Sequence, residues 1–159
     1  MAHNQFEQLK KLILLLDDPR NDIYVHVDAK SRDFDQEKFL NLTKNAGLSF
    51  IKRKKVTWGA YSQIRCELDL LEYATKKYHD YYHLLSGADL PIKNQDQIHT
   101  FFKTNQGTEF LSMHEDVMET KSYRDRIQVY HLLQELVGNK KSDSLEEKQY
   151  ETCLQAFTD

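Results

Sequence analysis

The fold is decided by the stretch Ile23-Tyr24-Val25-His26-Val27-Asp28-Ala29-Lys30. Its first five residues form a β-branched and aromatic run after a turn-forming cluster at 17–22, so they predict a short strand. The strand then stops at two charged residues, Asp28 and Lys30. A buried strand followed by polar residues is typical of a parallel sheet, in which ligands bind beyond the carboxyl ends of the strands.

Helix and strand patterns alternate on both sides of this strand. Before it, Asn4 and Glu7 have the spacing of a capping box, and apolar residues recur at helical spacing as far as Leu16. The elements expected after it are a helix near 35–45, a strand near 48–51, a helix near 62–77 with Ile64, Leu68 and Leu71 on one face, a strand at 81–85, a helix capped by Asn94, a strand near 109–113, and two helices between 126 and 157.

This alternation predicts an α/β protein. Strands separated by helices give a mainly parallel sheet that is covered on both faces, which is a three-layer sandwich. The chain has 159 residues, 40% of them hydrophobic, which is enough for one sizeable core. We therefore expect a single domain over residues 1–159.

Composition excludes several classes of partner and compartment. The net charge is −3 with both signs interspersed, unlike the basic surface of a nucleic-acid-binding protein, and the run at 52–55 is interpreted as a solvated strand end. Cys66 and Cys153 form no C-x-x-C pair, which favours reduced thiols in the cytoplasm. The longest apolar run, 12–16, is too short to span a membrane, so a soluble chain is expected.

Motifs of other enzyme classes are missing or incomplete. Asp33-Phe34-Asp35 has the form D-x-D, but it lies where a surface helix is expected to begin and is interpreted as a solvated acidic turn. His114-Glu115 lacks the second histidine of a zinc protease, and neither glycine-rich phosphate-binding motif occurs. We expect no metal site and no cofactor.

Three loops that follow strands could bind a ligand, and each has a structural alternative. Asp28 and Lys30 could contact a ribose or uracil and a phosphate, or Asp28 could simply cap a turn. Trp58, beside Gly59 in Val56-Thr57-Trp58-Gly59-Ala60-Tyr61-Ser62, could stack on a base or be buried in the core. The loop at 86–89 could admit a ligand closely or could be a turn before a proline.

Four blocks in order resemble one family. They are Met1-Ala2-His3-Asn4, residues 23–30, residues 56–62 and Leu84-Leu85-Ser86-Gly87-Ala88-Asp89-Leu90-Pro91. The sequence resembles the core-2/I-branching β-1,6-N-acetylglucosaminyltransferases, a family that includes peptide O-xylosyltransferases, and in particular its bacterial members. The resemblance implies a GT-A-like (Rossmann-like) fold and metal-independent, inverting transfer of a sugar, typically N-acetylglucosamine, from UDP to a glycan hydroxyl.

The resemblance also implies roles for individual residues. The residues expected to contact the nucleotide sugar are Ala2, His3, Asp28, Lys30, Trp58, Ser86, Gly87 and Asp89, and those expected to contact the acceptor are Lys121 and Arg124. Relatives have a strand just before the first block, and their catalytic carboxylate and pyrophosphate-binding cations lie beyond the position of Asp159. The expectation is therefore a partial domain, incomplete at both ends, that binds a donor, is inactive alone, and self-associates through an exposed sheet edge.

One other function is compatible with the sequence, and a second fits it poorly. A noncatalytic interaction domain could retain the α/β scaffold without the chemistry. An unrelated nucleotide-binding enzyme of the doubly wound class would need a glycine-rich first loop that this chain lacks.

Overall fold

A two-stranded parallel sheet lies at the centre of the protein. The computed structural model describes residues 1–110 and 134–137. Strand β1 (Asp22–Val25) pairs with β2 (Gly47–Phe50), with Asp22 opposite Gly47 and Val25 opposite Phe50. Both strands predicted from β-branched and aromatic runs are therefore confirmed.

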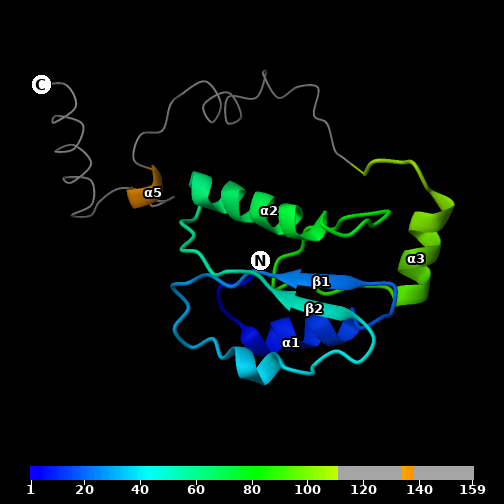
Figure 1. Cartoon of the computed structure of the whole chain (residues 1–159), viewed down its shortest axis with the longest axis horizontal. Helices are drawn as coiled ribbons and strands as arrows, with labels where there is room; N and C mark the ends of the chain where they lie inside the picture. The colour runs from blue at the N-terminus through cyan, green and yellow to red at the C-terminus, as the bar shows by residue number, and fades with distance from the viewer. Residues whose placement is uncertain (111–133, 138–159) are drawn as a thin grey trace, which may run out of the picture.

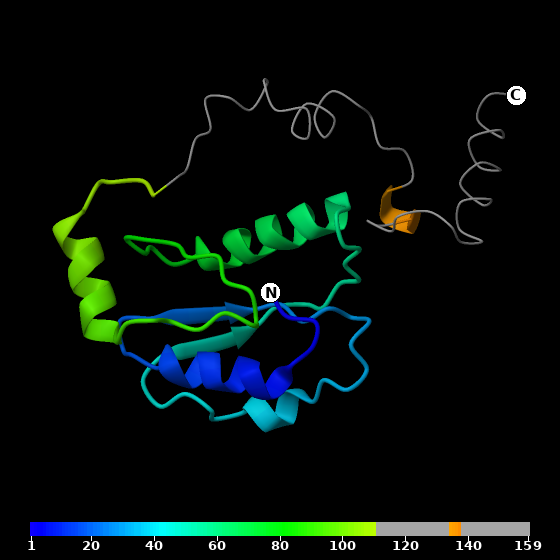
Figure 2. The ribbon, with the colours of Figure 1, turned by 180° about the vertical axis from the view of Figure 1, so that it is seen from behind.

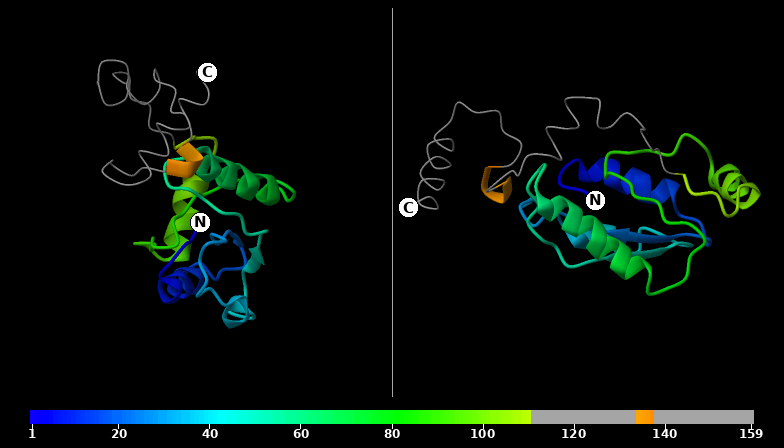
Figure 3. Two further views of the ribbon diagram at one scale, coloured as in Figure 1. Left: turned by 90° about the vertical axis from the view of Figure 1, so that its left-hand side faces the viewer. Right: turned by 90° about the horizontal axis from the view of Figure 1, so that it is seen from above.

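Helices cover both faces of this sheet. Helix α1 (Phe6–Leu15) lies on one side and α2 (Tyr61–Ala74) on the other (Figures 1 and 2). Helix α3 (Gln95–Thr104) lies beyond one end of the strands, and the short α5 (Gln134–Val137) lies beside the first turn of α2 (Figure 3). The predicted α/β class and its helix, sheet, helix layering are confirmed.

The core fills the space between the sheet and α1. Leu9 and Ile13 of α1 pack on Val25 and Val27, which point to the same face because side chains alternate along a strand. Phe39 completes this cluster from the 3₁₀ helix η1 (Gln36–Phe39) and is only 2% exposed. The end of β1 and the residues just after it thus contribute Val25 and Val27 to the core on this face, and a polar loop begins directly afterwards at Asp28.

The predicted helix at 35–45 is wrong. Only the four residues of η1 are helical, and Asp35 caps them by accepting a hydrogen bond from the Glu37 N–H (3.0 Å). Asn41 then has φ 57°, which stops a right-handed helix. Phe34 and Phe39 must both reach the core from this short segment, and that packing overrides the weak helical pattern. Asp35 is a turn residue, as expected for the D-x-D sequence.

The predicted capping box at the N-terminus is also wrong. Helix α1 begins after Gln5, which has φ 53° and makes no side-chain cap. Ala2 instead forms an isolated parallel bridge with Val27, so the first residues run along the end of β1. This pairing holds the chain extended where the capping pattern required Asn4 to start a helix.

The segment at 81–85 does not form the predicted strand. It forms no regular secondary structure, and its sheet-like contacts come only at its end, where the Met1 nitrogen donates to the Leu85 carbonyl (2.8 Å) and the Gly87 N–H donates to the Met1 carbonyl (2.7 Å). A strand needs a neighbouring strand to pair with. Within the described residues, the only such neighbour is the two-residue segment of Met1 and Ala2. The mainly parallel sheet predicted with this strand is thus limited to β1 and β2 in the part of the chain that the structure describes.

Two further predictions fall partly outside the described residues. Glu109 and Phe110 belong to no strand, and residues 111–113 are not described. Of the two helices predicted between 126 and 157, only the part that forms α5 is described.

The apolar face of α2 points away from the core. Ile64, Leu68 and Leu71 do lie on one face, but they are 53%, 46% and 44% exposed. The buried residues of this helix are Cys66, Asp69 and Leu70. Self-association through an exposed sheet edge stays a prediction, and this face of α2 is a separate exposed apolar surface.

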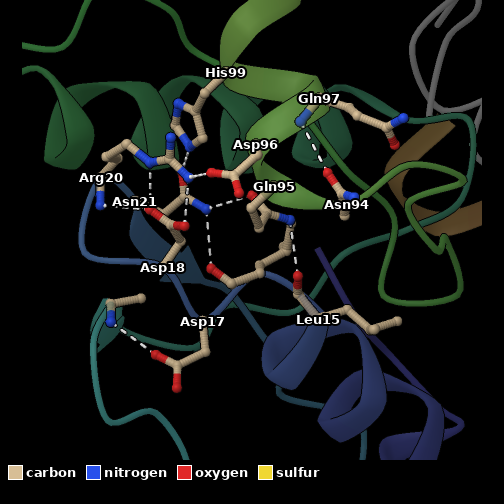
Figure 4. A network of polar contacts seen from close by, with 12 residues as sticks. Leu15, Asp17, Asp18, Arg20, Asn21, Asn94, Gln95, Asp96, Gln97 and His99 are labelled. Atoms are coloured by element: carbon tan, nitrogen blue, oxygen red, sulfur yellow. Dashed lines mark hydrogen bonds and ion pairs between the residues drawn. The ribbon is translucent and has the colours of Figure 1, made fainter.

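A network of polar contacts ties α3 to the turn between α1 and β1 (Figure 4). Arg20 donates to Asp18 and to Asp96, both at 2.7 Å. Asn21 donates to Gln95 at 2.9 Å and also contacts His99 at 3.0 Å. The bonds to Asp96, Gln95 and His99 join residues more than seventy positions apart, so they fix where α3 starts.

The predicted cap of α3 is confirmed. The Asn94 side chain accepts a hydrogen bond from the Gln97 N–H at 2.9 Å. This bond satisfies one of the free N–H groups of the first turn.

Stability should fall in acid because this network depends on an ionised carboxylate. The Arg20 guanidinium lowers the pKa of Asp18 to about 2. A carboxyl whose pKa is depressed on folding stabilises the protein above its unfolded pKa, and that contribution is lost as the pH falls toward the folded value. We expect the thermal midpoint of the wild type to drop between about pH 5 and about pH 2, and Asp18→Asn to show a flatter acid limb. Parallel profiles for the two proteins would contradict this.

Candidate functional site

Four segments meet at the carboxyl end of β1. The Ala2 N–H donates to the His26 carbonyl and the Asp28 N–H donates to the Ala2 carbonyl, both at 2.9 Å. The Ala29 N–H donates to the Lys54 carbonyl at 3.0 Å, and the Gly87 N–H reaches Met1. The structure therefore brings Ala2, His3, Asp28, Lys30 and the 86–89 loop together around the end of this strand.

Asp28 is the central carboxylate of this cluster and is 7% exposed. Its Oδ1 accepts a hydrogen bond from the Lys30 N–H at 2.8 Å and a long one from the Val56 N–H at 3.4 Å. Its Oδ2 faces the Lys30 ammonium at 3.7 Å and has no other partner among the described residues. The turn interpretation is correct for one oxygen, and the other retains capacity to accept hydrogen bonds from a ligand.

Two residues of the segments around this buried carboxylate, Lys30 and His3, are exposed. The Lys30 side chain is 53% exposed, and its ammonium lies 3.7 Å from Asp28 Oδ2. His3 is also exposed, and its backbone is fixed because the Ser31 hydroxyl donates to the His3 carbonyl at 2.5 Å. The exposed Lys30 ammonium is thus the charged side chain beside the Asp28 carboxylate, and the backbone of His3 is held close to the same loop.

His26 is a buried histidine behind the site that sequence reasoning did not single out. It is 1% exposed, and its Nε2 accepts a hydrogen bond from the Lys54 N–H at 3.0 Å. Burial lowers the pKa of His26, which favours the neutral ring that this bond requires. Its place in the strand, on the face opposite Val25 and Val27, was the available signal.

Trp58 is exposed, which removes the core interpretation of this residue. The indole is 68% exposed and precedes Gly59, whose φ of 76° allows the turn into α2. The Ser62 N–H in the first turn of α2 donates to the Glu135 carboxylate, so α5 occupies this helix end (Figure 3). The ring is thus available for stacking, while the Ser62 N–H at this helix end already has a partner.

The loop at 86–89 is a turn that closes on itself. The Ser86 N–H donates to Asp89 Oδ2 at 2.8 Å, and the Asp89 N–H donates to the Ser86 carbonyl at 3.1 Å. A Cβ on Gly87 would lie 2.7 Å from the Ala2 Cβ and 3.2 Å from its Cα. The glycine therefore permits close approach of Ala2, where the sequence had suggested approach of a ligand.

Gly87→Ala should destabilise the protein by about 1–3 kcal/mol, the cost of forcing an extra methyl into packed atoms. Since the nearest contact is the Ala2 Cβ, the double variant with Ala2→Gly should recover part of the loss. Urea denaturation of the three proteins measures both effects. Equal midpoints for the wild type and Gly87→Ala would show that the N-terminal residues are not packed here.

The remaining candidates cannot be placed. Lys121 and Arg124 lie outside the described residues. Within residues 1–110 and 134–137, no group of three or more histidine, cysteine, aspartate or glutamate side chains could hold a metal ion. No helix in this part of the chain is long and apolar enough to cross a membrane.

Layered helices and a polar cluster at the carboxyl end of a parallel strand define the chain as an α/β protein, and open α/β sheets bind ligands at this end of their strands. The chain belongs to the Core-2/I-Branching enzyme family, a family of glycosyltransferases, which matches it over residues 1–145.

The similarity extends to a curated relative. Xylosyltransferase oxt of Drosophila pseudoobscura pseudoobscura is 30% identical over 113 residues, which cover 67% of this chain and 12% of that protein. The chain therefore spans only a small part of the length of this relative. No solved structure matches the chain.

Proposed function

We propose that this chain forms the donor-binding part of an inverting, metal-independent glycosyltransferase with a GT-A-like fold. The donor would be a UDP-sugar, with N-acetylglucosamine as the sugar, and the acceptor a hydroxyl of a glycan, as in polysaccharide synthesis on the cytoplasmic side of a membrane. The family match over residues 1–145 supports the reaction class, and the isolated cysteines support the compartment.

One observation carries the proposal. Asp28 Oδ2 and the Lys30 ammonium, 3.7 Å apart, lie together at the carboxyl end of β1, where open α/β sheets bind ligands. The carboxylate would accept hydrogen bonds from the uracil or the ribose, and the ammonium would favour the diphosphate. Trp58 would stack on a ring of the donor, since its indole is exposed.

The chemistry needs groups beyond this donor site. Inverting transfer requires a carboxylate that deprotonates the attacking hydroxyl and cations that stabilise the leaving diphosphate. We assign neither to the described residues, and we propose Lys121 and Arg124 as acceptor contacts. The chain alone is therefore expected to bind UDP without turnover.

Isothermal titration with UDP and with UDP-N-acetylglucosamine, each with and without Mg²⁺, tests this function. We expect saturable binding of both ligands that Mg²⁺ does not change. A folded chain that binds neither ligand would refute the proposal. Binding that needs Mg²⁺ would refute its metal-independent form.

The alternative is a noncatalytic α/β interaction domain. The exposed face of Ile64, Leu68 and Leu71 favours it, because contiguous exposed apolar side chains mark surfaces that contact other proteins. Under this alternative, Asp28→Ala and Trp58→Ala would leave partner binding unchanged. A folded chain without affinity for UDP is the result that would put this alternative ahead.

A further inference from the structure

Arg53 is the residue of the basic run at 52–55 that does not point into solvent. Its Nε donates to the Val27 carbonyl at 3.3 Å, and its Nη2 donates to the Asp28 carbonyl at 2.7 Å and to the Ser31 carbonyl at 2.5 Å. Its guanidinium carbon also lies 5.2 Å from the centre of the Phe34 ring. The interpretation of this run as a solvated strand end is therefore wrong for Arg53.

These three carbonyls belong to the segment that carries the proposed donor contacts. Strand β1 ends at Val25, and Val27 forms the bridge to Ala2. The backbone then turns so that the carbonyls of Asp28 and Ser31 converge on one guanidinium. Arginine presents several N–H donors in a rigid plane, so one side chain can fix carbonyls that point in different directions. A lysine, with a single ammonium, matches this arrangement less well.

The charge of Arg53 is not neutralised by a neighbouring carboxylate. Within the described residues it makes no ion pair, whereas the adjacent Lys54 pairs with Asp69. Because the guanidinium donates its hydrogen bonds to backbone carbonyls, its positive charge lies against the backbone of the loop that carries Asp28 and Lys30. That position suits a loop whose ligand is an anion.

We propose that Arg53 is a positioning residue of the donor site, which fixes the loop at 28–31 so that Asp28 Oδ2 and the Lys30 ammonium face a nucleoside diphosphate. Arg53 acts through the backbone of the loop and does not contact the ligand. The proposal rests on the donor-binding function proposed above, but the restraint on the loop is independent of any ligand.

The loop restraint is tested by amide hydrogen exchange in the free protein. The Ser31 N–H donates to the Asp28 carbonyl and the Ala29 N–H donates to the Lys54 carbonyl, both at 3.0 Å. Arg53→Met should speed exchange of both amides by about tenfold or more, since the loss of a charged hydrogen bond has effects of this size. The Ile51 amide, bonded to the Val25 carbonyl in the sheet, should be unaffected. Unchanged exchange at Ala29 and Ser31 would overturn the proposal.

The ligand arm uses UDP as the probe and Lys52→Met as the matched control. Lys52 is exposed and adjacent, so its loss removes the same charge without touching the loop. Arg53→Met should weaken UDP binding by about tenfold or more, Arg53→Lys should weaken it less, and Lys52→Met should leave it within about twofold. Equal losses of UDP affinity for Arg53→Met and Lys52→Met would show that Arg53 acts only through its charge, and would overturn the proposal.

A double-variant cycle distinguishes positioning from an independent contact. If Arg53 acts through Asp28, then adding Arg53→Met to Asp28→Asn should cost less than the sum of the two single losses. Additive losses would contradict the positioning role. If Arg53→Met does not fold, Arg53→Lys carries the same exchange and binding comparisons. If the wild type binds no UDP, the donor-binding function fails, while the exchange result still decides whether Arg53 holds the loop.

Discussion

Phe39→Ala is expected to lower the free energy of unfolding by about 3–5 kcal/mol, the range for truncating a buried phenylalanine to alanine. Phe39 is 2% exposed, and its ring lies 5.3 Å from the ring of Phe34 and 5.6 Å from that of Phe50. Its removal leaves a cavity where η1, β2 and the preceding loop meet. Urea denaturation followed by circular dichroism gives the change.

Leu40→Ala is the matched control for this prediction. Leu40 is the next residue in the chain and is 65% exposed, so its truncation should change stability by no more than about 0.5 kcal/mol. The comparison also tests the conformation of the segment, because a regular helix over 35–45 would bury a different set of side chains. A larger loss for Leu40→Ala than for Phe39→Ala would contradict the core described here.

The parts of the fold that sequence predicted correctly are those determined by local signals. The run at 23–27 is dense in β-branched and aromatic residues, the run at 48–51 contains Phe50 and Ile51, and β1 and β2 lie at these two places. Helix α3 begins where the Asn94 cap places it, because a side-chain cap is a local hydrogen bond. These elements required no knowledge of distant residues.

The wrong predictions come from segments whose conformation is set by distant partners. The segment at 81–85 has good strand composition, but its main-chain hydrogen bonding within the described residues is limited to the bond that Leu85 accepts from Met1. The helix at 35–45 gave way to η1 because Phe34 and Phe39 both pack on the core. Nothing local to either segment reveals which neighbour it will have.

The site shows the same division. The polar residues after β1 could be recognised from the end of the strand, and the structure brings Asp28 and Lys30 together as expected. The exposure of Trp58 could not be predicted, since a loop tryptophan is as readily buried. Arg53 was hidden in a basic run, because only the fold shows that its side chain turns inward to three carbonyls.

Asp28→Asn is expected to weaken UDP binding by about 10–100-fold, the range for losing a hydrogen bond to a charged group. An asparagine oxygen can still accept the bonds that Asp28 Oδ1 receives from the Lys30 and Val56 N–H groups, so the turn should survive. What the variant loses is the negative charge and the second acceptor, Oδ2. The loss of affinity should therefore come without a comparable loss of stability, as titration and thermal unfolding would show.

Asp33→Asn is the matched control, because it makes the same change in charge at an exposed position nearby. It should leave UDP affinity within about twofold, since a solvated carboxylate is screened and contributes little. If both Asp28→Asn and Asp33→Asn bind UDP with the affinity of the wild type, Asp28 is a turn residue only. If Asp28→Asn loses both affinity and stability, the carboxylate serves the loop first, and the ligand contact must then be sought at Lys30 and Trp58.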